Sequence, residues 1–157
     1  MKTPTIEMLK KVPVFSRLTN EELGILLEHM ALLKFNKGKI LFNEGDKGDY
    51  VCFVVNGRLD VIKRTFTNDE FILNTLSRGQ SFGEMSIIES SPRSATVKAN
   101  TDVEIVRLSQ GDFDAILKEH PGIGTKILKG VSLLLSRKLR QTSSRLIGYM
   151  SKELQAG

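Results

Sequence analysis

The residues with the clearest chemical potential lie between positions 79 and 99, which read GQSFGEMSIIESSPRSATVKA. In this stretch Glu84 and Arg93 flank an apolar pair, Ile87 and Ile88, which a plain strand–turn–strand would not need. An arginine offers a planar fork of N–H donors that matches a phosphate group. A carboxylate accepts hydrogen bonds from hydroxyl groups. Together the two side chains predict a site for a small anion that also carries sugar hydroxyls.

The residues around this acid and base have further features of an anion site. Gly83 allows a ligand to approach the main chain closely. If a short helical turn begins at Glu84, the free N–H groups of its first residues point toward one spot. Ser94 and Thr96 add hydroxyl groups. The alternative is a Glu84–Arg93 ion pair across a hairpin that binds no ligand, and spacing alone leaves both interpretations open.

Residues for catalysis or metal binding are scarce. The two histidines, His29 and His120, fall on predicted helix ends away from the strands. The single cysteine, Cys52, lies in the apolar run VCFVV and is expected in the core. No nucleophile elbow, Walker loop or EF-hand pattern occurs. We therefore predict a binding module and not an enzyme, with no catalytic residues, no metal and no cofactor.

Length and composition describe a protein with one core. The 157 residues suit a single domain with an appended helix, and 40% hydrophobic with 26% charged residues is ordinary for a globular protein. The first residues, MKTPTIEMLKK, lack the apolar stretch of a signal peptide. No apolar run approaches the roughly 18 residues of a membrane span. We therefore expect a cytoplasmic protein with no membrane partner.

Three regions of different periodicity position the candidate site. Residues 1–30 are expected to form an N-terminal helical segment, with Thr19 or Asn20 capping the helix in RLTNEELGILLEHM. Residues 31–109 contain short alternating runs such as KILF, YVCFVV and VEIVRL between closely spaced turn signals. Residues 110–157 are expected to be helical again. This order predicts a mainly β protein, an antiparallel β jelly-roll barrel with N-terminal helices and a long C-terminal helix.

The strand region carries one specific pairing signal. Asn56-Gly57 stands between the runs YVCFVV and RLDVIKR, and this dipeptide is typical of a two-residue hairpin turn. We therefore expect these two strands to pair with each other. An immunoglobulin-like sandwich is the alternative all-β arrangement, and the flanking helices count against it.

The last segment, GIGTKILKGVSLLLSRKLRQTSSRLIGYMSKELQAG, predicts one long helix without an internal proline. Positions 128, 135, 142 and 149 repeat every seven residues, and Val131, Leu139 and Leu146 lie beside them. Such a seam favours pairing with the same helix of a second chain, which predicts a homodimer through residues 125–150. The alternative is a helix folded back on its own barrel.

Positive charge is concentrated in the same segment. The chain has a net charge of +5, and from Pro121 onward seven basic residues stand against one acidic residue, Glu153. A basic helix can bind nucleic acid or an acidic membrane surface. A solvated helix face is the more common reason for such a charge pattern, and it is the expectation here.

The segment FGEMSIIESSPRSATV resembles the phosphate-binding cassette of cyclic nucleotide-binding domains. These domains occur in bacterial catabolite activator proteins, in regulatory subunits of protein kinase A and in cyclic-nucleotide-gated channels. The cassette's glycine, acid, base and small residue are matched by Gly83, Glu84, Arg93 and Ala95. The family's two glycine turns are matched by Glu44-Gly45-Asp46 and Asn56-Gly57-Arg58-Leu59, and the likeness runs from about Phe15 to Leu146.

The resemblance implies a role for each matching residue. Arg93 would bind the cyclic phosphate together with Ser94. The main-chain N–H groups around Met85 and Ser86 would complete the phosphate site. Glu84 would bind the ribose 2′-hydroxyl. Apolar strand residues would cover the sugar and base, and their counterparts here are Val61, Leu73 and Leu76.

The final helix also resembles a known element. LLSRKLRQTSSRLIG is similar to the dimer helix of catabolite activator proteins, whose Thr-Ser pair reaches the adenine from both subunits. That pair falls on Thr142 and Ser143. The likeness favours cyclic AMP as the ligand. Cyclic GMP is the alternative, and relatives that prefer it often carry Thr directly after the cassette arginine, where this chain has Ser94.

The resemblance therefore predicts a cyclic nucleotide sensor that signals through its C-terminal helix to a downstream protein that the sequence does not name. Catabolite activator-type regulators continue into a DNA-binding helix-turn-helix domain, and this sequence ends at Gly157. Nucleic acid is therefore not an expected partner of this chain alone. One alternative is the ligand-sensing half of a DNA-binding transcription regulator. Another is a barrel that binds no nucleotide and acts as a scaffold.

Overall fold

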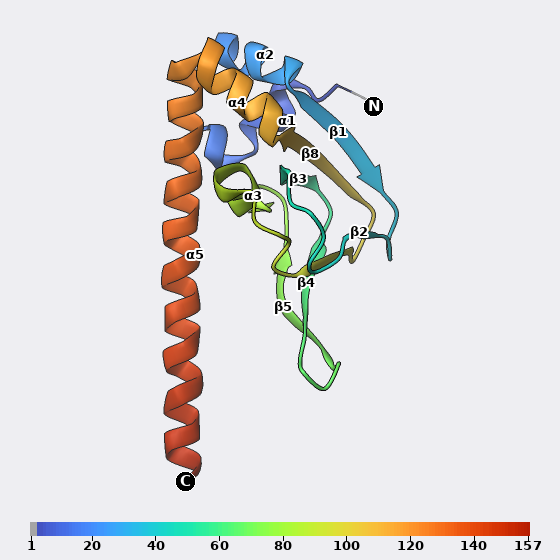
Figure 1. Ribbon diagram of the computed structural model, residues 1–157, viewed down its shortest axis with the longest axis vertical. Coiled ribbons are helices and arrows are strands. Elements are labelled where there is room, and N and C mark those ends of the chain that lie inside the picture. The colour runs from blue at the N-terminus through green and yellow to red at the C-terminus, as the bar shows by residue number, and fades with distance from the viewer. Residues whose placement is uncertain (1–2) are drawn as a thin grey trace.

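The computed structural model describes residues 3–157, and their helices and strands follow the predicted order (Figure 1). Two α-helices and a 3-10 helix come first: α1 (Ile6–Lys10), η1 (Pro13–Phe15) and α2 (Asn20–Glu28). Strands occupy the middle of the chain. Two helices end it, α4 (Gln110–Glu119) and the long α5 (Pro121–Ala156).

The strands form two four-stranded antiparallel sheets. One sheet has the order β1 (Met30–Phe35), β8 (Val103–Ser109), β3 (Tyr50–Asn56), β6 (Ser81–Phe82). The other has the order β2 (Ile40–Phe42), β7 (Thr96–Ala99), β4 (Leu59–Arg64), β5 (Glu70–Leu76). Side chains from both sheets, such as Val54 and Val97, share one buried cluster, so the sheets pack face to face. The predicted mainly β jelly roll with flanking helices is confirmed.

The predicted hairpin at Asn56-Gly57 is wrong. β3 pairs with β6 and β8, whereas β4 pairs with β5 and β7, so the chain crosses from one sheet to the other at this point. Gly57 has a φ of 87°, and a Cβ there would clash with the Asp102 carbonyl oxygen. The glycine therefore meets the same backbone demand as a hairpin turn, which is why the dipeptide suggests one.

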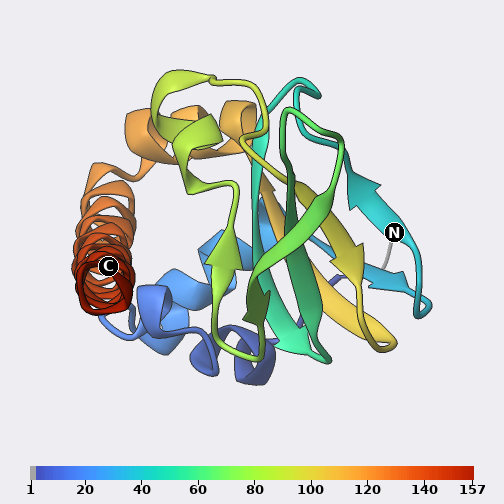
Figure 2. The ribbon, with the colours of Figure 1, turned by 90° about the horizontal axis from the view of Figure 1, so that it is seen from below.

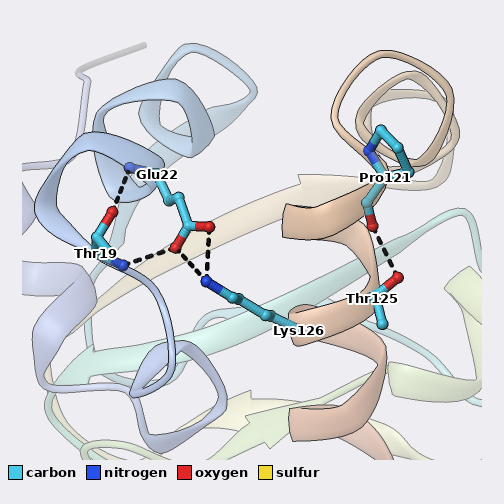
Figure 3. A network of polar contacts seen from close by, with 5 residues as sticks. All are labelled: Thr19, Glu22, Pro121, Thr125 and Lys126. Atoms are coloured by element: carbon cyan, nitrogen blue, oxygen red, sulfur yellow. Dashed lines mark hydrogen bonds and ion pairs between the residues drawn. The ribbon is translucent and has the colours of Figure 1, made fainter.

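α2 begins with a capping box, and the glutamate of this box also contacts α5 (Figure 3). Thr19 Oγ1 accepts from the Glu22 N–H at 3.2 Å, and Glu22 Oε2 accepts from the Thr19 N–H at 2.8 Å. This reciprocal capping box begins α2 at the first of the two predicted cap positions. Lys126 Nζ of α5 donates to both Glu22 carboxylate oxygens at 2.7 and 2.8 Å. The Lys126 hydrogen bonds, with those from Thr19, hold the pKa of Glu22 below its ordinary value.

One core supports both the helices and a sheet. Its fully buried side chains come from the helices and from the β1-β8-β3-β6 sheet, and they include Leu9 of α1, Leu26 of α2, Phe53 of β3, Phe113 of α4 and Ile127 of α5. The first part of α5 is therefore fixed to the body of the domain. Farther along the chain, α5 extends beyond the end of the strands (Figure 1).

The contact between α5 and η1 is unusually close. A Cβ at Gly130 would clash with the Val14 carbonyl oxygen, so the two main chains approach as only glycine allows. Val131, the next residue, is fully buried. Farther along α5 the apolar side chains of Leu139, Leu146 and Tyr149 are exposed. The predicted seam is therefore divided, with its first part packed against η1 and α4 and its second part largely exposed.

Candidate functional site

A cavity of about 1120 Å³ lies between the 81–95 segment, the β4–β5 pair and the second part of α5. Figure 2, which looks along α5, shows this helix standing beside the strands with α3 (Glu84–Glu89) near it. The cavity is lined by all the predicted ligand residues except one: Val61, Leu73, Leu76, Gly83, Glu84, Met85, Ser86, Arg93, Ser94, Ala95 and Thr142.

The exception is Ser143. It is exposed on α5 and does not line the cavity, although its neighbour Thr142 does. Successive residues of an α-helix point about 100° apart, so the two side chains cannot share one face. The structure therefore assigns only the threonine of this pair to the cavity of its own chain.

The cassette is built on a glycine and a short helix. Strand β6 ends at Phe82, Gly83 takes a left-handed conformation with a φ of 79°, and α3 begins at Glu84. A Cβ at Gly83 would clash with Arg93 Nη1, so glycine is required both by its φ and by the arginine. The predicted helical turn at Glu84 is confirmed. The Ser86 N–H donates to the Gly83 carbonyl oxygen at 3.1 Å and is thus engaged within this turn.

Glu84 is buried, with 5% of its surface exposed, and its partner comes from α5. Glu84 Oε1 accepts from Ser81 Oγ at 2.6 Å and from Lys138 Nζ at 2.6 Å. Lys138 Nζ also donates to the Ser81 carbonyl oxygen at 2.8 Å. No ion pair joins Glu84 to Arg93 in the part of the chain that the structure describes. The alternative of a hairpin ion pair is therefore wrong.

Lys138 is a cavity residue that the sequence analysis did not single out. It lies four residues before Thr142, and residues at this spacing share one face of a helix. That spacing is the signal that could have found it once Thr142 was placed in the site. Other basic or polar lining residues on the same helix are Gln141, Arg145, Tyr149 and Lys152.

Arg93 is the other buried charge of the site, with 4% of its surface exposed. Its Nη1 donates to Ser86 Oγ at 2.9 Å. Its Nε and Nη2 are buried and have no hydrogen-bond acceptor. Unsatisfied charged donors are costly inside a protein, so they favour any anion that supplies the missing acceptors. This is the feature of the cavity that most clearly indicates a ligand.

The wall behind Arg93 contributes no negative charge. Burial raises the pKa of the Cys52 thiol to about 12, which keeps it neutral and confirms its predicted place in the core. Burial also raises the pKa of the Tyr50 hydroxyl above its ordinary value. The charge of Arg93 is therefore not cancelled from the core side of the cassette.

A lysine on β4 contacts the end of the cassette that follows Arg93. Lys63 Nζ donates to the Ser94 carbonyl oxygen at 2.7 Å and lies 2.6 Å from Glu44 Oε1. The contact with Lys63 lowers the pKa of Glu44. β4 and the Glu44-Gly45-Asp46 turn are thereby tied to the residue that follows Arg93.

Histidines and acidic residues do not gather as metal ligands. His29 ends α2, and His120 stands between α4 and α5, as predicted, and neither lines the cavity. Among residues 3–157 no three His, Cys, Asp or Glu side chains are grouped closely enough to hold a metal ion. Over the same residues, no helix combines the length and the apolar character that crossing a membrane requires.

The face-to-face sheets, together with the buried acid and base beside a long helix, define a ligand-binding jelly-roll domain. The chain belongs to the cyclic nucleotide-binding domain family, whose model matches residues 32–120. Among solved structures, a cyclic nucleotide-binding domain from Methylobacillus flagellatus KT is similar, with a TM-score of 0.82, 29% identity and coverage of 90% of this chain and 80% of that one. The catabolite activator protein of Thermus thermophilus has a TM-score of 0.75 at 29% identity, covering 85% of this chain and 61% of that chain.

Curated relatives are mostly longer proteins. The cyclic AMP receptor protein of Thermus thermophilus is 29% identical over 138 residues, which are 88% of this chain and 62% of the relative. A cGMP-dependent protein kinase of Plasmodium berghei is 34% identical over 111 residues, 71% of this chain but 12% of the kinase. The chain thus spans less than two thirds of each of these relatives.

Proposed function

We propose that this protein is a cyclic nucleotide sensor and that cyclic AMP is its preferred ligand. The observation that carries the proposal is Arg93, a buried guanidinium in the cavity wall with two donors that lack acceptors. A cyclic phosphate supplies oxygen acceptors and one negative charge. Family membership supports a nucleotide over other anions. The relative named as a cyclic AMP receptor supports adenine over guanine, because it matches 88% of this chain whereas the cGMP-dependent kinase matches 71%.

The parts of the nucleotide are assigned to the residues predicted for them. The phosphate meets Arg93 and Ser94, together with main-chain N–H groups at the start of α3. Because the Ser86 N–H already donates to Gly83, the N–H groups before it carry this contact. The ribose 2′-hydroxyl donates to Glu84, whose Oε1 is shared by Ser81 and Lys138. Val61, Leu73 and Leu76 cover the sugar and base.

We assign the nucleobase to the part of the cavity that is lined by α5. Thr142 lines it, whereas Ser143 does not, which suits a serine that serves the cavity of a second subunit. The exposed apolar residues Leu139, Leu146 and Tyr149 support pairing of α5 with a second copy through residues 125–150. We therefore propose a homodimer in which each cavity is completed by both helices.

The signal leaves the site through α5. Lys138 joins this helix directly to the carboxylate that we assign to the ribose. A ligand shifts a conformational equilibrium only by binding one state more tightly than the other. A ligand hydroxyl that donates to Glu84 competes with Lys138 for the carboxylate oxygens, and so favours one position of α5. We expect the receiver to be another protein and the place of action to be the cytoplasm, and we propose no catalytic role.

A second candidate is the sensing part of a transcription regulator. The N-terminal domain of a Streptomyces coelicolor regulator supports it, with a TM-score of 0.73, 29% identity and coverage of 88% of this chain and 94% of that chain. DNA binding by this chain alone is not part of the first proposal. A gel shift with duplex DNA tests it, and a specific retarded band that requires cyclic AMP would favour the regulator.

The proposal is tested by titration calorimetry of the purified chain with cyclic AMP, cyclic GMP and the open nucleotide 5′-AMP. We expect saturable heat with cyclic AMP, weaker binding of cyclic GMP and little binding of 5′-AMP. At about 100 times its dissociation constant the ligand should add roughly 2.7 kcal/mol of stability. No heat and no melting shift with either cyclic nucleotide would contradict the proposal.

A further inference from the structure

The guanidinium of Arg93 lies between two aromatic rings from opposite sheets. Its Cζ is 4.2 Å from the centroid of the Phe42 ring on β2 and 4.2 Å from that of the Tyr50 ring on β3. The two ring centroids are 6.3 Å apart and the rings are inclined at 70°. A cation this close to two ring faces is attracted by both quadrupoles. The two rings therefore contact the Arg93 guanidinium from two directions.

These contacts replace the usual partner of a buried arginine. A buried charge is normally paired with a carboxylate. No carboxylate pairs with Arg93 among residues 3–157, and Glu84 is held by Lys138 instead. A carboxylate would stabilise the guanidinium but would also fill its donors and compete with a ligand anion. The faces of aromatic rings stabilise the same charge and accept none of its in-plane hydrogen bonds.

The orientation of the fork is also fixed. Ser86 Oγ accepts from Nη1, and the two rings oppose rotation of the plane. Nε and Nη2, the two nitrogens without acceptors, stand on the same edge of a guanidinium, where their N–H bonds run side by side. Held in this way, the edge is pre-organised for two oxygens of one phosphate, and a pre-organised group binds with less loss of entropy.

We propose that Phe42 and Tyr50 form an aromatic clamp that positions Arg93 and thereby sets both the affinity and the stereochemical preference for a phosphodiester anion. This inference rests on the proposed function, because it concerns the same cavity. Phe42 and Tyr50 are positioning residues, since they act through the arginine. Lost stacking on Tyr50 should weaken binding about tenfold, the scale of a desolvated cation–π contact.

The test compares Tyr50→Leu with Tyr50→Phe, which keeps the ring and loses only the hydroxyl. Each is titrated with cyclic AMP and with the two phosphorothioate diastereomers in which sulfur replaces one or the other non-bridging oxygen. We expect Tyr50→Phe to match the wild type. Tyr50→Leu should bind cyclic AMP about tenfold more weakly and discriminate less between the diastereomers. Phe42→Leu should change both quantities in the same direction, and it replaces Tyr50→Leu if melting shows that the latter is unfolded.

The outcomes separate this inference from the proposed function. If the wild type binds neither cyclic AMP nor cyclic GMP, the proposed function and the clamp both fail. If the wild type binds and Tyr50→Leu keeps its affinity and diastereomer preference, the clamp alone is overturned. A variant that melts lower and loses affinity for both diastereomers equally also overturns it, because this result shows a structural role only.

Discussion

Lys138 Nζ of α5 lies 2.6 Å from Glu84 Oε1 of α3, and this ion pair joins residues 54 positions apart. Glu84 is almost fully buried, whereas the lysine side chain is 37% exposed. A buried carboxylate that loses its cationic partner is left in a poorly solvated place, so the pair holds α5 against the cassette. The ligand cavity and the long helix are thus coupled by a direct contact between charged groups.

Replacing Arg93 should separate binding from stability. Arg93→Met removes a buried charge whose Nε and Nη2 lack acceptors, while the methionine still packs between Phe42 and Tyr50. We expect affinity for cyclic AMP to fall at least about a hundredfold. The ligand-free variant should melt at or above the wild-type temperature, since each orphaned donor costs about 1–3 kcal/mol. Calorimetry and thermal melting measure the two effects, and a variant that binds normally would remove Arg93 from the site.

Neutralising Glu84 should abolish discrimination at the ribose. Glu84→Gln keeps the size of the side chain but weakens its hydrogen bond to a hydroxyl from about 1.5–3 kcal/mol to about 0.5–1.5 kcal/mol. The wild type should bind cyclic AMP more tightly than its 2′-deoxy analogue, and the variant should bind both with similar, weak affinity. An unchanged ratio between the two ligands in the variant would show that Glu84 does not contact the ribose.

Two glycines of α5 form a matched pair for testing how the helix is seated. Gly130→Ala should clash with the Val14 carbonyl oxygen, lower stability by about 1–3 kcal/mol and weaken cyclic AMP binding by moving α5. Gly148→Ala meets no atom within 4 Å and should melt at or above the wild type, since alanine favours helix. Equal melting temperatures for the two variants would contradict the close contact at η1.

Acid should weaken the junction between α2 and α5. Because the folded pKa of Glu22 lies below the ordinary 4.5, its contribution is present above that value and is lost as pH falls through the folded pKa. Glu22→Gln should cost about 1 kcal/mol at pH 7 through the lost charge on the Lys126 contact, since glutamine can still complete the capping box. Urea unfolding is measured from pH 7 to pH 3. The difference in unfolding free energy between variant and wild type should shrink below about pH 4.5. Glu21→Gln is the control. A stability difference between Glu22→Gln and wild type that grows as the pH falls would refute the stabilising role of ionised Glu22.

A charge on the exposed part of α5 should break the proposed dimer. Leu139 is 68% exposed and lies on the predicted seam without lining the cavity. Leu139→Asp should shift the protein to monomer in sedimentation velocity runs, because an aspartate cannot be buried unpaired in a helix seam. Ser144→Asp, on the same helix, should leave the dimer intact. A wild-type protein that sediments as a monomer at all concentrations, with and without cyclic AMP, would rule out the dimer.

Much of the site could be predicted because the cassette is local in sequence. Gly83, Glu84 and Arg93 lie within eleven consecutive positions, so their residue types alone indicate a turn, an acid and a base near one another. The capping box of α2 is also local, and its spacing of three residues predicts it directly. Such short-range features carry their geometry in the sequence.

The contacts that complete the site could not be predicted, because they depend on packing between distant elements. The partner of Glu84 is Lys138, and nothing in the spacing of the cassette prefers it to Arg93. Phe42 and Tyr50 look like ordinary strand residues, and only the meeting of β2 and β3 around Arg93 reveals their stacking. The hairpin predicted at Asn56-Gly57 is wrong for a related reason. A glycine with a positive φ occurs where the chain crosses between sheets as well as in a hairpin turn.

The central claim is that the cavity binds a cyclic nucleotide through Arg93, and one paired titration tests it most directly. Wild type and Arg93→Met are each titrated calorimetrically with cyclic AMP, after melting has shown that both are folded. The account predicts saturable binding to the wild type with one site per chain and no measurable heat with Arg93→Met. Absence of binding to the folded wild type, or equal binding to both proteins, would contradict it.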